Sequence, residues 1–493
     1  MSYRILMITS EAVPFAKSGG LADMVSALSI ELYQSGSDVR ILMPLYGFIS
    51  KEELKLIDPN FEVSYKNYKE NCALYEGKLP LSKIPVYFLD SAKFYERNGI
   101  YGPTASSAYP DNGLRYSLLS RAALQLGKRI DWNPQIFHSH DWPTGLNPVY
   151  LKLSDKETSS SKCASVFTIH NLGYQGRFSM RNTPWAGITP EIVHQYHFED
   201  QNRMNYLKAG IENSDMITTV SPTYASEIQT KDFGHGLDPI LSRRSKYLKG
   251  IVNGVDYNDW NPEIDKHIVP HNYSLADPDG KKALKKQLQK EMGLEISTSK
   301  PLFAMISRLV EQKGIEELCG PGNGVLEGFC KNNDVQLVIL GTGEKWCETE
   351  LKRLGEELDN LSVTISYNDY LSHLIEAGAD FFMMPSRYEP CGLNQLYSLK
   401  YGTLPIVRRT GGLADTVQAP DKEDCNGTGF LFDEISPEAF LAALEKACSY
   451  WYEKPAIIEQ MKILAMEQDF SWGPSAEEYL KVYKEALTIA SGK

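Results

Sequence analysis

Two glycines follow a lysine and a serine at residues 17–20, between an apolar run and an amphipathic run. Glycines let backbone N–H groups approach an anion closely, and the N-terminus of a following helix adds partial positive charge. Lys17 adds a full positive charge, so the run with Gly19 and Gly20 predicts a site for an anionic group. It matches neither the G-x-G-x-x-G dinucleotide pattern nor the Walker phosphate loop. A Gly-Gly pair before a helix also occurs as a plain tight turn, and the run alone leaves both interpretations open.

A second polar run, His170-Asn171-Leu-Gly-Tyr174-Gln-Gly, directly follows an apolar segment. Imidazole, amide and phenol groups at the carboxyl end of a strand suit hydrogen bonding to a polyhydroxyl ligand, because open α/β sheets bind ligands at that edge. Upstream, the run His-Ser-His-Asp at residues 138–141 offers two imidazoles and a carboxylate. The two histidines are only two residues apart and no third-ligand motif follows, so a metal site is disfavoured.

Two basic residues, Arg308 and Lys313, flank a predicted turn after the first strand of the second half of the chain. Such a pair can neutralise a diphosphate, and arginine can bind it through two parallel hydrogen bonds. For this segment in isolation, a surface basic pair is the favoured interpretation.

Residues 385–395, with the sequence PSRYEPCGLNQ, also follow an apolar run. We expect Gly392 and Leu393 to open a helix whose free N–H groups receive phosphate or sugar hydroxyls. Glu389 is placed to bind hydroxyls or to offset positive charge. A catalytic nucleophile at Cys391 is disfavoured, because no papain-like or caspase-like signature accompanies it. The GGLAD sequence of residues 19–23 recurs at 411–415, which suggests similar construction in the two halves.

Short apolar runs that alternate with helical or turn segments indicate the elements that position these residues. The predicted strands are 3–9, 39–43, 86–89, 136–138, 165–169 and 216–220, then 302–306, 336–340, 363–365, 381–384 and 404–407. Such alternation in two stretches predicts two parallel-sheet α/β domains, with a boundary near residues 253–262. Five lysines between 281 and 290 share a helical segment, which we interpret as a solvated face rather than a basic recognition helix.

The composition is that of an ordinary globular protein: 493 residues, 42% hydrophobic, with a formal net charge of −12. The acidic balance argues against broad binding of nucleic acid or anionic membranes. None of the eight cysteines is in C-x-x-C spacing. No signal peptide and no membrane-spanning run is evident, so we expect a cytoplasmic protein with reduced thiols.

With these segments assembled, the chain resembles the bacterial glycogen synthases, the ADP-glucose-type starch synthases of glycosyltransferase family 5. The resemblance extends from residue 17 to residue 472. The matching segments are KSGGLAD, HSHDW, TIHNLGYQG, TTVSPTYASEI, NGVDYNDWNP, ISRLVEQKG, PSRYEPCGLNQLYSLKYGTLPIVRRTGGLADTV and DFSW.

The resemblance implies the α/β GT-B fold, in which two Rossmann-like parallel-sheet domains face a deep interdomain cleft. The implied domains are 1–255 on the glucan acceptor side, 256–469 on the nucleotide-sugar side, and a helical segment 470–493 that crosses back to the first. The implied reaction extends an α-1,4-glucan at its non-reducing end, using ADP-glucose, with retention of configuration and release of ADP. No cofactor and no metal is implied. A retaining transferase that uses UDP-glucose or another acceptor is the alternative, and the oligomeric state is left open.

The resemblance also implies roles for individual residues. Arg308 and Lys313 correspond to the pair that stabilises the leaving diphosphate, and His170 and Glu389 to groups at the donor glucose. Further donor-site positions are Lys17, Gly19, Gly20, Asn171, Asn253, Cys391, Gly392 and Leu393, with Tyr367 where an aromatic ring stacks on adenine. Positions assigned to the cleft or acceptor are Asp23, Tyr101, Asp141 and Tyr174. The expected mechanism is front-face substitution, in which the leaving phosphate takes the acceptor's proton.

Two positions depart from related patterns. Pro143 follows Trp142 where many family members have histidine, which removes one expected polar contact near a sugar. Tyr397 stands where many other retaining GT-B families have a second glutamate, in agreement with the glycogen synthase branch. Two alternatives of another kind are a glucan-binding protein with a decayed site and a dehydrogenase. The intact set of Lys17, His170, Arg308, Lys313 and Glu389 disfavours the first, and the lack of G-x-G-x-x-G disfavours the second.

Overall fold

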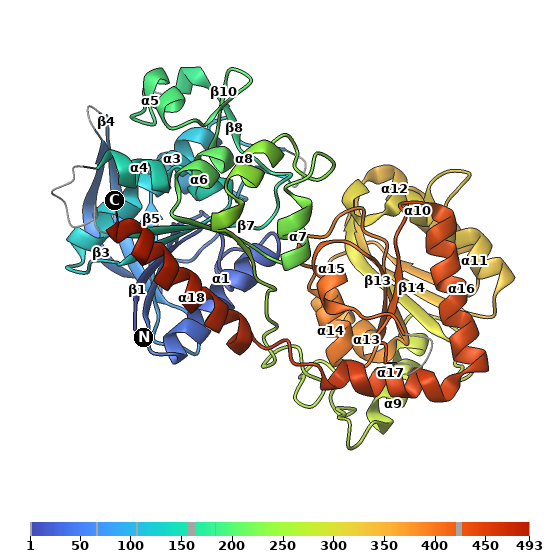
Figure 1. Cartoon of the computed structure of the whole chain (residues 1–493). Helices are drawn as coiled ribbons and strands as arrows, with labels where there is room; N and C mark the ends of the chain where they lie inside the picture. The colour runs from blue at the N-terminus through green and yellow to red at the C-terminus, as the bar shows by residue number, and fades with distance from the viewer. Residues whose placement is uncertain are drawn as a thin grey trace. The chain divides into compact units, whose positions relative to one another are not determined.

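The computed structural model describes residues 2–65, 68–104, 107–154, 163–182, 184–420 and 426–492. It divides the chain into two compact units (Figure 1). Unit 1 consists of Met1–Gly254 together with Trp472–Lys493, and unit 2 consists of Val255–Ser471. Each unit contains a mainly or wholly parallel sheet with helices packed on it, which confirms the predicted α/β class.

Unit 1 is built on a nine-stranded sheet in the order β12-β11-β7-β6-β1-β2-β5-β4-β3. The strands from β12 to β5 are parallel, and β4 and β3 form an antiparallel hairpin at one edge. Their bounds are β1 Arg4–Ile8, β2 Asp38–Pro44, β3 Lys55–Tyr65, β4 Tyr68–Lys78, β5 Pro85–Asp90, β6 Ile136–His140, β7 Ala164–Ile169, β11 Met216–Thr219 and β12 Leu248–Gly250. A small antiparallel sheet contains β8 Arg177–Ser179, β9 Glu199–Asp200 and β10 Arg203–Asn205.

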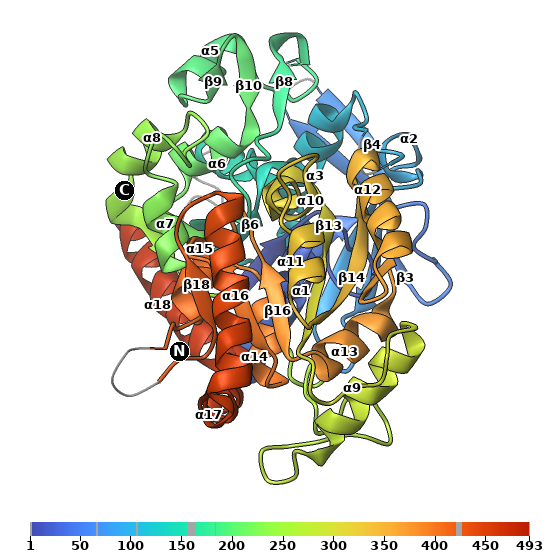
Figure 2. The ribbon, with the colours of Figure 1, turned by 90° about the vertical axis from the view of Figure 1, so that its right-hand side faces the viewer.

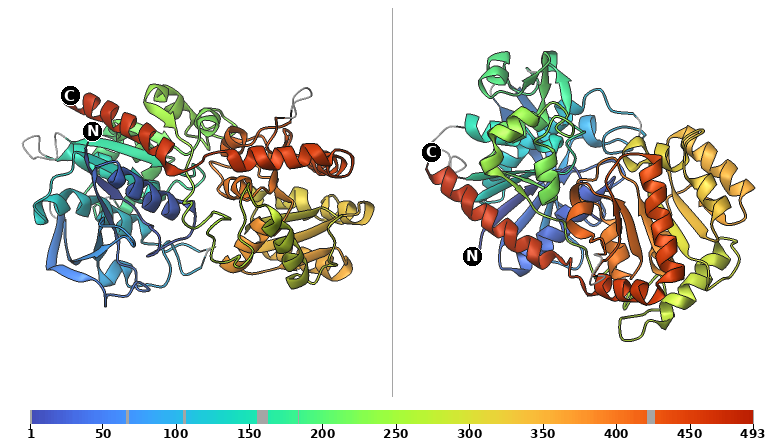
Figure 3. Two further views of the ribbon diagram at one scale, coloured as in Figure 1. Left: turned by 90° about the horizontal axis from the view of Figure 1, so that it is seen from below. Right: turned by 45° about the vertical axis from the view of Figure 1, so that its right-hand side comes forward.

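The helices of unit 1 include one from the end of the chain. They are α1 Gly20–Gln34, α2 Ala92–Tyr95, α3 Asn112–Arg129, α4 Asn147–Leu153, α5 Pro190–Gln195, α6 Tyr206–Asn213, α7 Pro222–Glu227, α8 Asp238–Arg243 and α18 Trp472–Ser491, with 3₁₀ turns at Trp142–Thr144, Met180–Asn182 and Ser245–Tyr247. Helix α18 packs against α1 and β7 and ends at the C-terminus (Figures 1 and 3). Its buried side chains, Trp472, Tyr479 and Tyr483 among them, belong to the same core as β1 and β2.

Unit 2 has a six-stranded parallel sheet in the order β15-β14-β13-β16-β17-β18. The strands are β13 Leu302–Leu309, β14 Gln336–Gly343, β15 Leu361–Thr364, β16 Phe381–Met384, β17 Leu404–Arg408 and β18 Phe430–Phe432. The helices are α9 Asp279–Glu291, α10 Ile315–Cys319, α11 Leu326–Asn332, α12 Lys345–Glu357, α13 Asp369–Gly378, α14 Asn394–Lys400, α15 Gly411–Thr416, α16 Pro437–Glu453 and α17 Pro455–Glu467, with a 3₁₀ turn at Glu311–Lys313.

Alternation along the strands of unit 2 divides its core into two layers. Phe303 and Met305 belong to one hydrophobic cluster, with side chains of α11, α12 and α16. Leu302 and Ala304 belong to another, with side chains of α9 and α13. Successive side chains of a strand point to opposite faces, so a strand buried on both faces reads as a continuous apolar run. Figure 2 shows α16 in front of the sheet.

The predicted strands are confirmed, with boundaries that shift by a few residues. The hairpin of β3 and β4 was not predicted, because its strands are not apolar runs: in β4, partly buried and exposed side chains alternate with few buried ones. This is typical of an antiparallel edge with one face toward solvent. Among the described residues, no helix is long and apolar enough to cross a bilayer.

The lysine-rich helix is α9, and its interpretation as a solvated face is wrong for Lys281, whose ammonium group donates to the Thr403 hydroxyl at 2.7 Å, and for Lys285. Lys282 is exposed, but Lys285 is only 7% exposed. Its ammonium group lies 2.6 Å from the Asp380 carboxylate and donates to the Lys300 carbonyl at 2.7 Å. The carboxylate also accepts from the backbone N–H of Leu302. This ion pair therefore connects α9 to the first residue of β13 and to the residue that precedes β16.

Replacing Lys285 by methionine keeps most of the side-chain volume and leaves the Asp380 carboxylate with less compensation. Breaking one partner of a buried ion pair costs about 3–5 kcal/mol of unfolding free energy. We expect Lys285→Met to lower the midpoint of chemical denaturation correspondingly, as followed by circular dichroism. Lys282→Met on the same helix is the matched control and should leave the midpoint unchanged. Equal midpoints for the two variants would contradict the role assigned to the pair.

Candidate active site

The parallel sheet of unit 2 brings its candidate residues to one edge. Arg308 lies at the end of β13, Tyr367 follows β15, and Glu389 follows β16. Parallel strands have their carboxyl ends at the same edge, which is where open α/β sheets bind ligands. Strand pairing therefore brings three segments distant in sequence to the same edge, with β14 between β13 and β15.

Lys313 and Glu389 form an ion pair at this edge. The Lys313 ammonium donates to Oε2 of Glu389, and the hydroxyl of Ser386 donates to the same oxygen at 3.1 Å. Glu389 is 6% exposed, so its carboxylate is largely removed from water. The ion pair orients Lys313 and compensates the buried carboxylate.

Arg308 differs from Lys313 in having no protein partner. It is exposed, and within the part of the chain that the structure describes its guanidinium makes no hydrogen bond or ion pair. An arginine has five N–H donors and remains charged at all ordinary pH values. The edge therefore presents a cation that is available to an anion.

Backbone contacts hold the loops of this edge together. The backbone N–H of Arg387 donates to the backbone carbonyl of Gln312 at 2.9 Å. The side-chain amide of Gln312 donates to the backbone carbonyl of Tyr388 at 3.2 Å. Gly314 has a φ of +72°, and a Cβ on it would lie 2.1 Å from the Pro385 carbonyl oxygen. Only glycine fits both conditions. The loop that carries Lys313 is thus packed directly against the loop that carries Glu389.

The two GGLAD segments serve different purposes. At Gly411 and Gly412 an added Cβ would lie 1.9 Å from the Glu389 carbonyl oxygen and 2.0 Å from that of Cys391, so these glycines allow close packing. At Gly19 an added Cβ would meet nothing within 4 Å. Both segments lie at the start of a helix, as similar construction predicts, but their packing differs: there is open space beside Gly19, whose N–H is hydrogen-bonded to Glu11.

The remaining candidates of unit 2 differ in exposure. Tyr367 is 81% exposed, whereas Cys391 is 5% exposed. The sequence predicted that Gly392 and Leu393 open a helix. Helix α14 instead begins at Asn394, so both residues precede it. Gly392 has a φ of +74°, which bends the chain ahead of the helix.

In unit 1 the candidates lie at the carboxyl ends of β1, β6 and β7, with a carboxylate that sequence reasoning missed. Glu11 is 2% exposed and accepts hydrogen bonds from the Ser18 hydroxyl at 2.8 Å and the Tyr101 hydroxyl at 2.5 Å, as well as from the Ser18 N–H. Burial raises the pKa of Glu11, and these hydrogen bonds only partly offset the effect. Glu11 thus holds the glycine loop, and Tyr101 contacts this carboxylate. The available signal was its position directly after a buried strand.

Lys17 and Asp23 form an ion pair of 2.7 Å across the start of α1. Both side chains are partly exposed, at 48% and 29% respectively. An acidic residue in the first turn also complements the helix dipole. Asp23 therefore orients Lys17 at the start of α1.

Asp141 and His170 are joined where β6 and β7 end. The Asp141 Oδ1 accepts the backbone N–H of His170 at 2.8 Å, and the carboxylate also accepts that of Asn171. Burial, with a smaller contribution from the nearby Glu11, raises the pKa of Asp141 to about 8 despite these bonds. Burial lowers the pKa of His170 to about 3, so its ring is neutral at ordinary pH.

Three other predicted positions have simple environments. Asn253 is 5% exposed, and its Oδ1 has no hydrogen-bond partner among the described residues. Tyr174 is 53% exposed. Pro143 lies within the 3₁₀ turn Trp142–Thr144, where a missing N–H is tolerated.

The departure at Tyr397 has a structural explanation. Its ring stacks on Trp260 at 3.9 Å between centroids, and His373 also stacks on Trp260, at 3.8 Å. An aromatic side chain at 397 thereby helps to hold the segment that follows residue 255 on unit 2.

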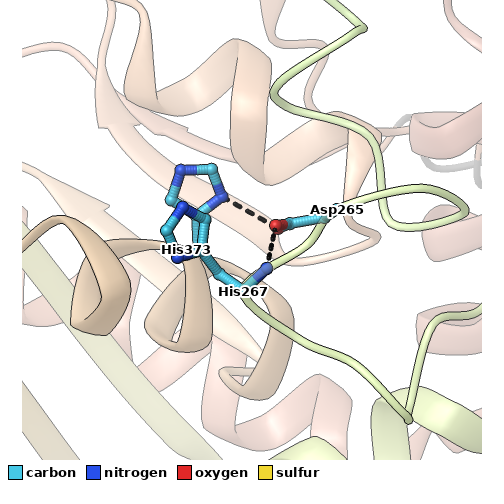
Figure 4. A group of neighbouring side chains, drawn as sticks. All are labelled: Asp265, His267 and His373. Carbon is cyan, nitrogen blue, oxygen red and sulfur yellow. Dashed lines mark hydrogen bonds and ion pairs between the residues drawn. The ribbon is translucent and has the colours of Figure 1, made fainter.

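Asp265, His267 and His373 form the one group of possible metal ligands found among the described residues (Figure 4). The Asp265 carboxylate accepts most of the hydrogen bonds in the group. Oδ2 of Asp265 accepts from His373 Nδ1 at 2.8 Å and from the Tyr401 hydroxyl at 2.6 Å, and Oδ1 accepts the His267 N–H at 2.8 Å. The two imidazole rings are tilted by 34°, with centroids 4.4 Å apart, and Nε2 of each ring is buried without a hydrogen-bond partner among the described residues. We interpret the group as a structural network.

The raised pKa of Asp141 predicts a stability change with pH. Its pKa is raised from the ordinary value of 3.8 to about 8 in the folded state, so its contribution to stability is fully present only below the lower value and is lost progressively as the pH rises to about 8. Asparagine cannot ionise, so we expect the melting temperature of Asp141→Asn to rise relative to that of the wild type between about pH 5 and about pH 8. The relative gain over this range should be about 2 °C or more and should level off above it.

Asp265→Asn is a control with the opposite sign. Burial opposes ionisation of Asp265, but hydrogen bonds from His373 and Tyr401 outweigh it and lower the pKa. Its stabilising contribution is therefore present at neutral pH and is lost as the pH falls. This variant should melt below the wild type at pH 7, with a smaller difference in acid. A pH-independent difference for Asp141→Asn would contradict the assignment.

Comparisons with known proteins agree with this geometry. Residues 4–243 match the starch synthase catalytic domain family, and residues 287–462 match the glycosyl transferases group 1 family. A glycogen synthase of Treponema denticola is 49% identical over 484 residues, 98% of each chain. Another, of Syntrophotalea carbinolica, is 41% identical over 490 residues, 98% of this chain and 99% of its own. The solved catalytic domain of starch synthase IV from Arabidopsis thaliana, bound to ADP and acarbose, is 30% identical with a TM-score of 0.88, covering 99% of this chain and 100% of that chain. The chain therefore belongs to glycosyltransferase family 5, the glycogen and starch synthases, and is a glucosyltransferase of glycogen synthesis with the GT-B fold of two Rossmann-like domains.

Proposed function

We propose that the enzyme transfers glucose from ADP-glucose to the non-reducing end of an α-1,4-glucan, with retention of configuration and release of ADP. The observation that carries the proposal is the unpartnered guanidinium of Arg308 on the same edge as the Lys313–Glu389 ion pair. The similar Arabidopsis thaliana domain was solved with ADP and acarbose, which supports both substrate classes.

Arg308 and Lys313 are assigned to the diphosphate of the donor. Negative charge develops on the leaving phosphate as the bond to the sugar breaks, and preorganised cations stabilise it most where they need not reorganise. Lys313 is already oriented by Glu389, and Arg308 has its donors available. These two side chains supply the role that a divalent ion fills in many phosphoryl sites.

Tyr367 is assigned to the adenine base. Its ring is 81% exposed on the same edge of the sheet as Arg308. Stacking of a base on such a ring is worth about 1–3 kcal/mol. Because uracil also has a flat face, the choice of ADP-glucose over UDP-glucose rests on the family resemblance and requires a direct measurement.

The polar groups of unit 1 are assigned to the sugars and to the donor phosphate. His170, Asn171, Asn253 and the Asp141 carboxyl offer donors and acceptors for hydroxyl groups. Lys17, Gly19 and Gly20 are assigned to the donor, and Asp23, Tyr101 and Tyr174 to the acceptor side. In this assignment unit 2 serves the nucleotide, and unit 1 serves the glucan together with the sugar and phosphate of the donor.

The state of Glu389 favours front-face substitution. A covalent mechanism needs a carboxylate free to attack the anomeric carbon. Oε2 of Glu389 is instead bound by Lys313 and Ser386. In the proposed step the bond from the anomeric carbon to the phosphate oxygen breaks, the acceptor hydroxyl attacks from the same face, and the leaving phosphate takes its proton.

The test of the function is incorporation of radiolabelled glucose into glycogen. The enzyme is incubated with glycogen and labelled ADP-glucose in the presence of EDTA, and in parallel with labelled UDP-glucose. We expect label in the polymer from ADP-glucose despite the EDTA, because fixed cations neutralise the diphosphate. Transfer from UDP-glucose should be slower. Faster transfer from UDP-glucose would overturn the donor assignment, and absence of label from both would overturn the proposal.

Replacing Arg308 by alanine removes the unpartnered cation without removing a structural contact. We expect kcat to fall by about 10²–10³-fold, by analogy with the removal of one donor that stabilises a developing anion. Arg353→Ala is the matched control, because Arg353 is bound on the surface of α12 by Glu350 and Glu357. It should leave kcat unchanged. An unchanged kcat for Arg308→Ala would refute the role of this residue.

A further inference from the structure

Three imidazole rings lie in a row where β6 and β7 end. His138 and His140 belong to β6 and are fully buried, and His170 directly follows β7. The rings of His138 and His140 are 4.2 Å apart between centroids, and those of His140 and His170 are 5.4 Å apart. His170 is assigned to the donor sugar, whereas no role follows for His140 from the family resemblance.

His140 contacts His170 through ring nitrogens. Nδ1 of His140 lies 3.2 Å from Nε2 of His170, so one of the two must donate a proton to the other. His138 cannot take part, because its nitrogens lie 2.9 Å from the Tyr483 hydroxyl and 2.6 Å from the Thr168 hydroxyl. Nε2 of His140 is buried without a hydrogen-bond partner among the described residues.

Only one direction of this hydrogen bond avoids a buried, unsatisfied N–H group. Burial lowers the pKa of both rings, so each is neutral and carries one N–H. If His170 donated, the single N–H of His140 would lie at Nε2, where no acceptor is available. If His140 donates from Nδ1, its Nε2 carries a lone pair and no proton. Orphaned buried N–H groups are the rarer of the two situations.

We propose that His140 is a positioning residue that donates from Nδ1 to Nε2 of His170 and so fixes the proton of His170 on Nδ1. The backbone N–H of His170 is held by Asp141, so both the main chain and the ring are oriented. Within the described part of the chain, Nδ1 of His170 makes no hydrogen bond and remains for the substrate.

The consequence concerns the reaction and rests on the proposed function. His170 presents a neutral N–H donor to an oxygen of the donor sugar. A neutral ring is suited to this place, because an imidazolium would repel the positive charge that develops on the sugar as the leaving group departs. Burial and His140 together thus supply a donor without adding charge.

The tautomer of His170 can be measured on the intact enzyme without substrate. Long-range ¹H–¹⁵N correlation spectra of enzyme labelled with ¹⁵N-histidine report whether each ring nitrogen carries a proton. His170→Asn identifies the resonances of His170. We expect a protonated Nδ1 and an unprotonated Nε2 in His170. Protonation at Nε2 would overturn the proposal, whatever reaction the enzyme catalyses.

Two variants of His140 differ in where they place an amide donor. In His140→Asn the amide nitrogen occupies the position of Nδ1, whereas in His140→Gln it occupies that of Nε2, away from His170. We expect His140→Asn to keep the wild-type tautomer of His170 and most of the activity. In His140→Gln the Nδ1-protonated form should be lost and kcat with ADP-glucose and glycogen should fall by about tenfold or more.

Melting temperatures and circular dichroism identify any variant that fails to fold. In that case the ¹H–¹⁵N correlation spectrum of the wild type alone tests the tautomer of His170. Equal kcat values for the two folded variants, or loss of activity in His140→Gln with an unchanged tautomer, would overturn the positioning role. If the wild type transfers no glucose while His170 is protonated at Nδ1, the proposed function fails and the tautomer assignment stands.

Discussion

Parallel strands end together at one edge of their sheet, and this constraint determines where most candidate groups of the protein lie. In unit 2 it brings Arg308, Tyr367 and Glu389 to one edge from three strands. In unit 1 it does the same for Glu11, Asp141 and His170. Strand pairing is made by backbone groups and buried apolar side chains, so the residues at the strand ends are free to serve chemistry.

Local charge, and not the charge of the whole chain, explains how an acidic protein holds an anionic donor. The formal net charge is −12, yet one edge combines an unpartnered arginine with a lysine that a buried glutamate holds in place. The ion pair with Glu389 orients Lys313 but partly compensates its positive charge. Within the described part of the chain, all N–H donors of Arg308 remain available. The two cations are therefore not equivalent, and in the proposed function binding of the diphosphate depends more on Arg308 than on Lys313.

Burial adjusts the protonation of unit 1 in a direction that suits a sugar site and costs stability. It raises the pKa values of Glu11 and Asp141 and lowers those of His138, His140 and His170, so both kinds of group tend toward neutrality. Neutral groups hydrogen-bond to hydroxyls without attracting or repelling a charged intermediate. Asp141 accepts hydrogen bonds from two backbone N–H groups, yet its pKa is raised to about 8. Desolvation therefore outweighs hydrogen bonding at this carboxyl group.

The sequence by itself determined the α/β class, most strands of both sheets and the residues at their ends, because apolar runs and glycine turns are local signals; the strands β3, β4, β12 and β18, at the sheet edges, were missed. It also determined the family, through long motifs such as PSRYEPCGLNQ. Only the tertiary structure decided that Glu11 binds Tyr101, that Lys285 is buried against Asp380, that His140 contacts His170, and that Gly411 packs where Gly19 stays open. These pairs are 30 to 95 residues apart in the chain or depend on packing around a turn. No local pattern encodes such a contact, because its energy arises only when distant segments exclude water together.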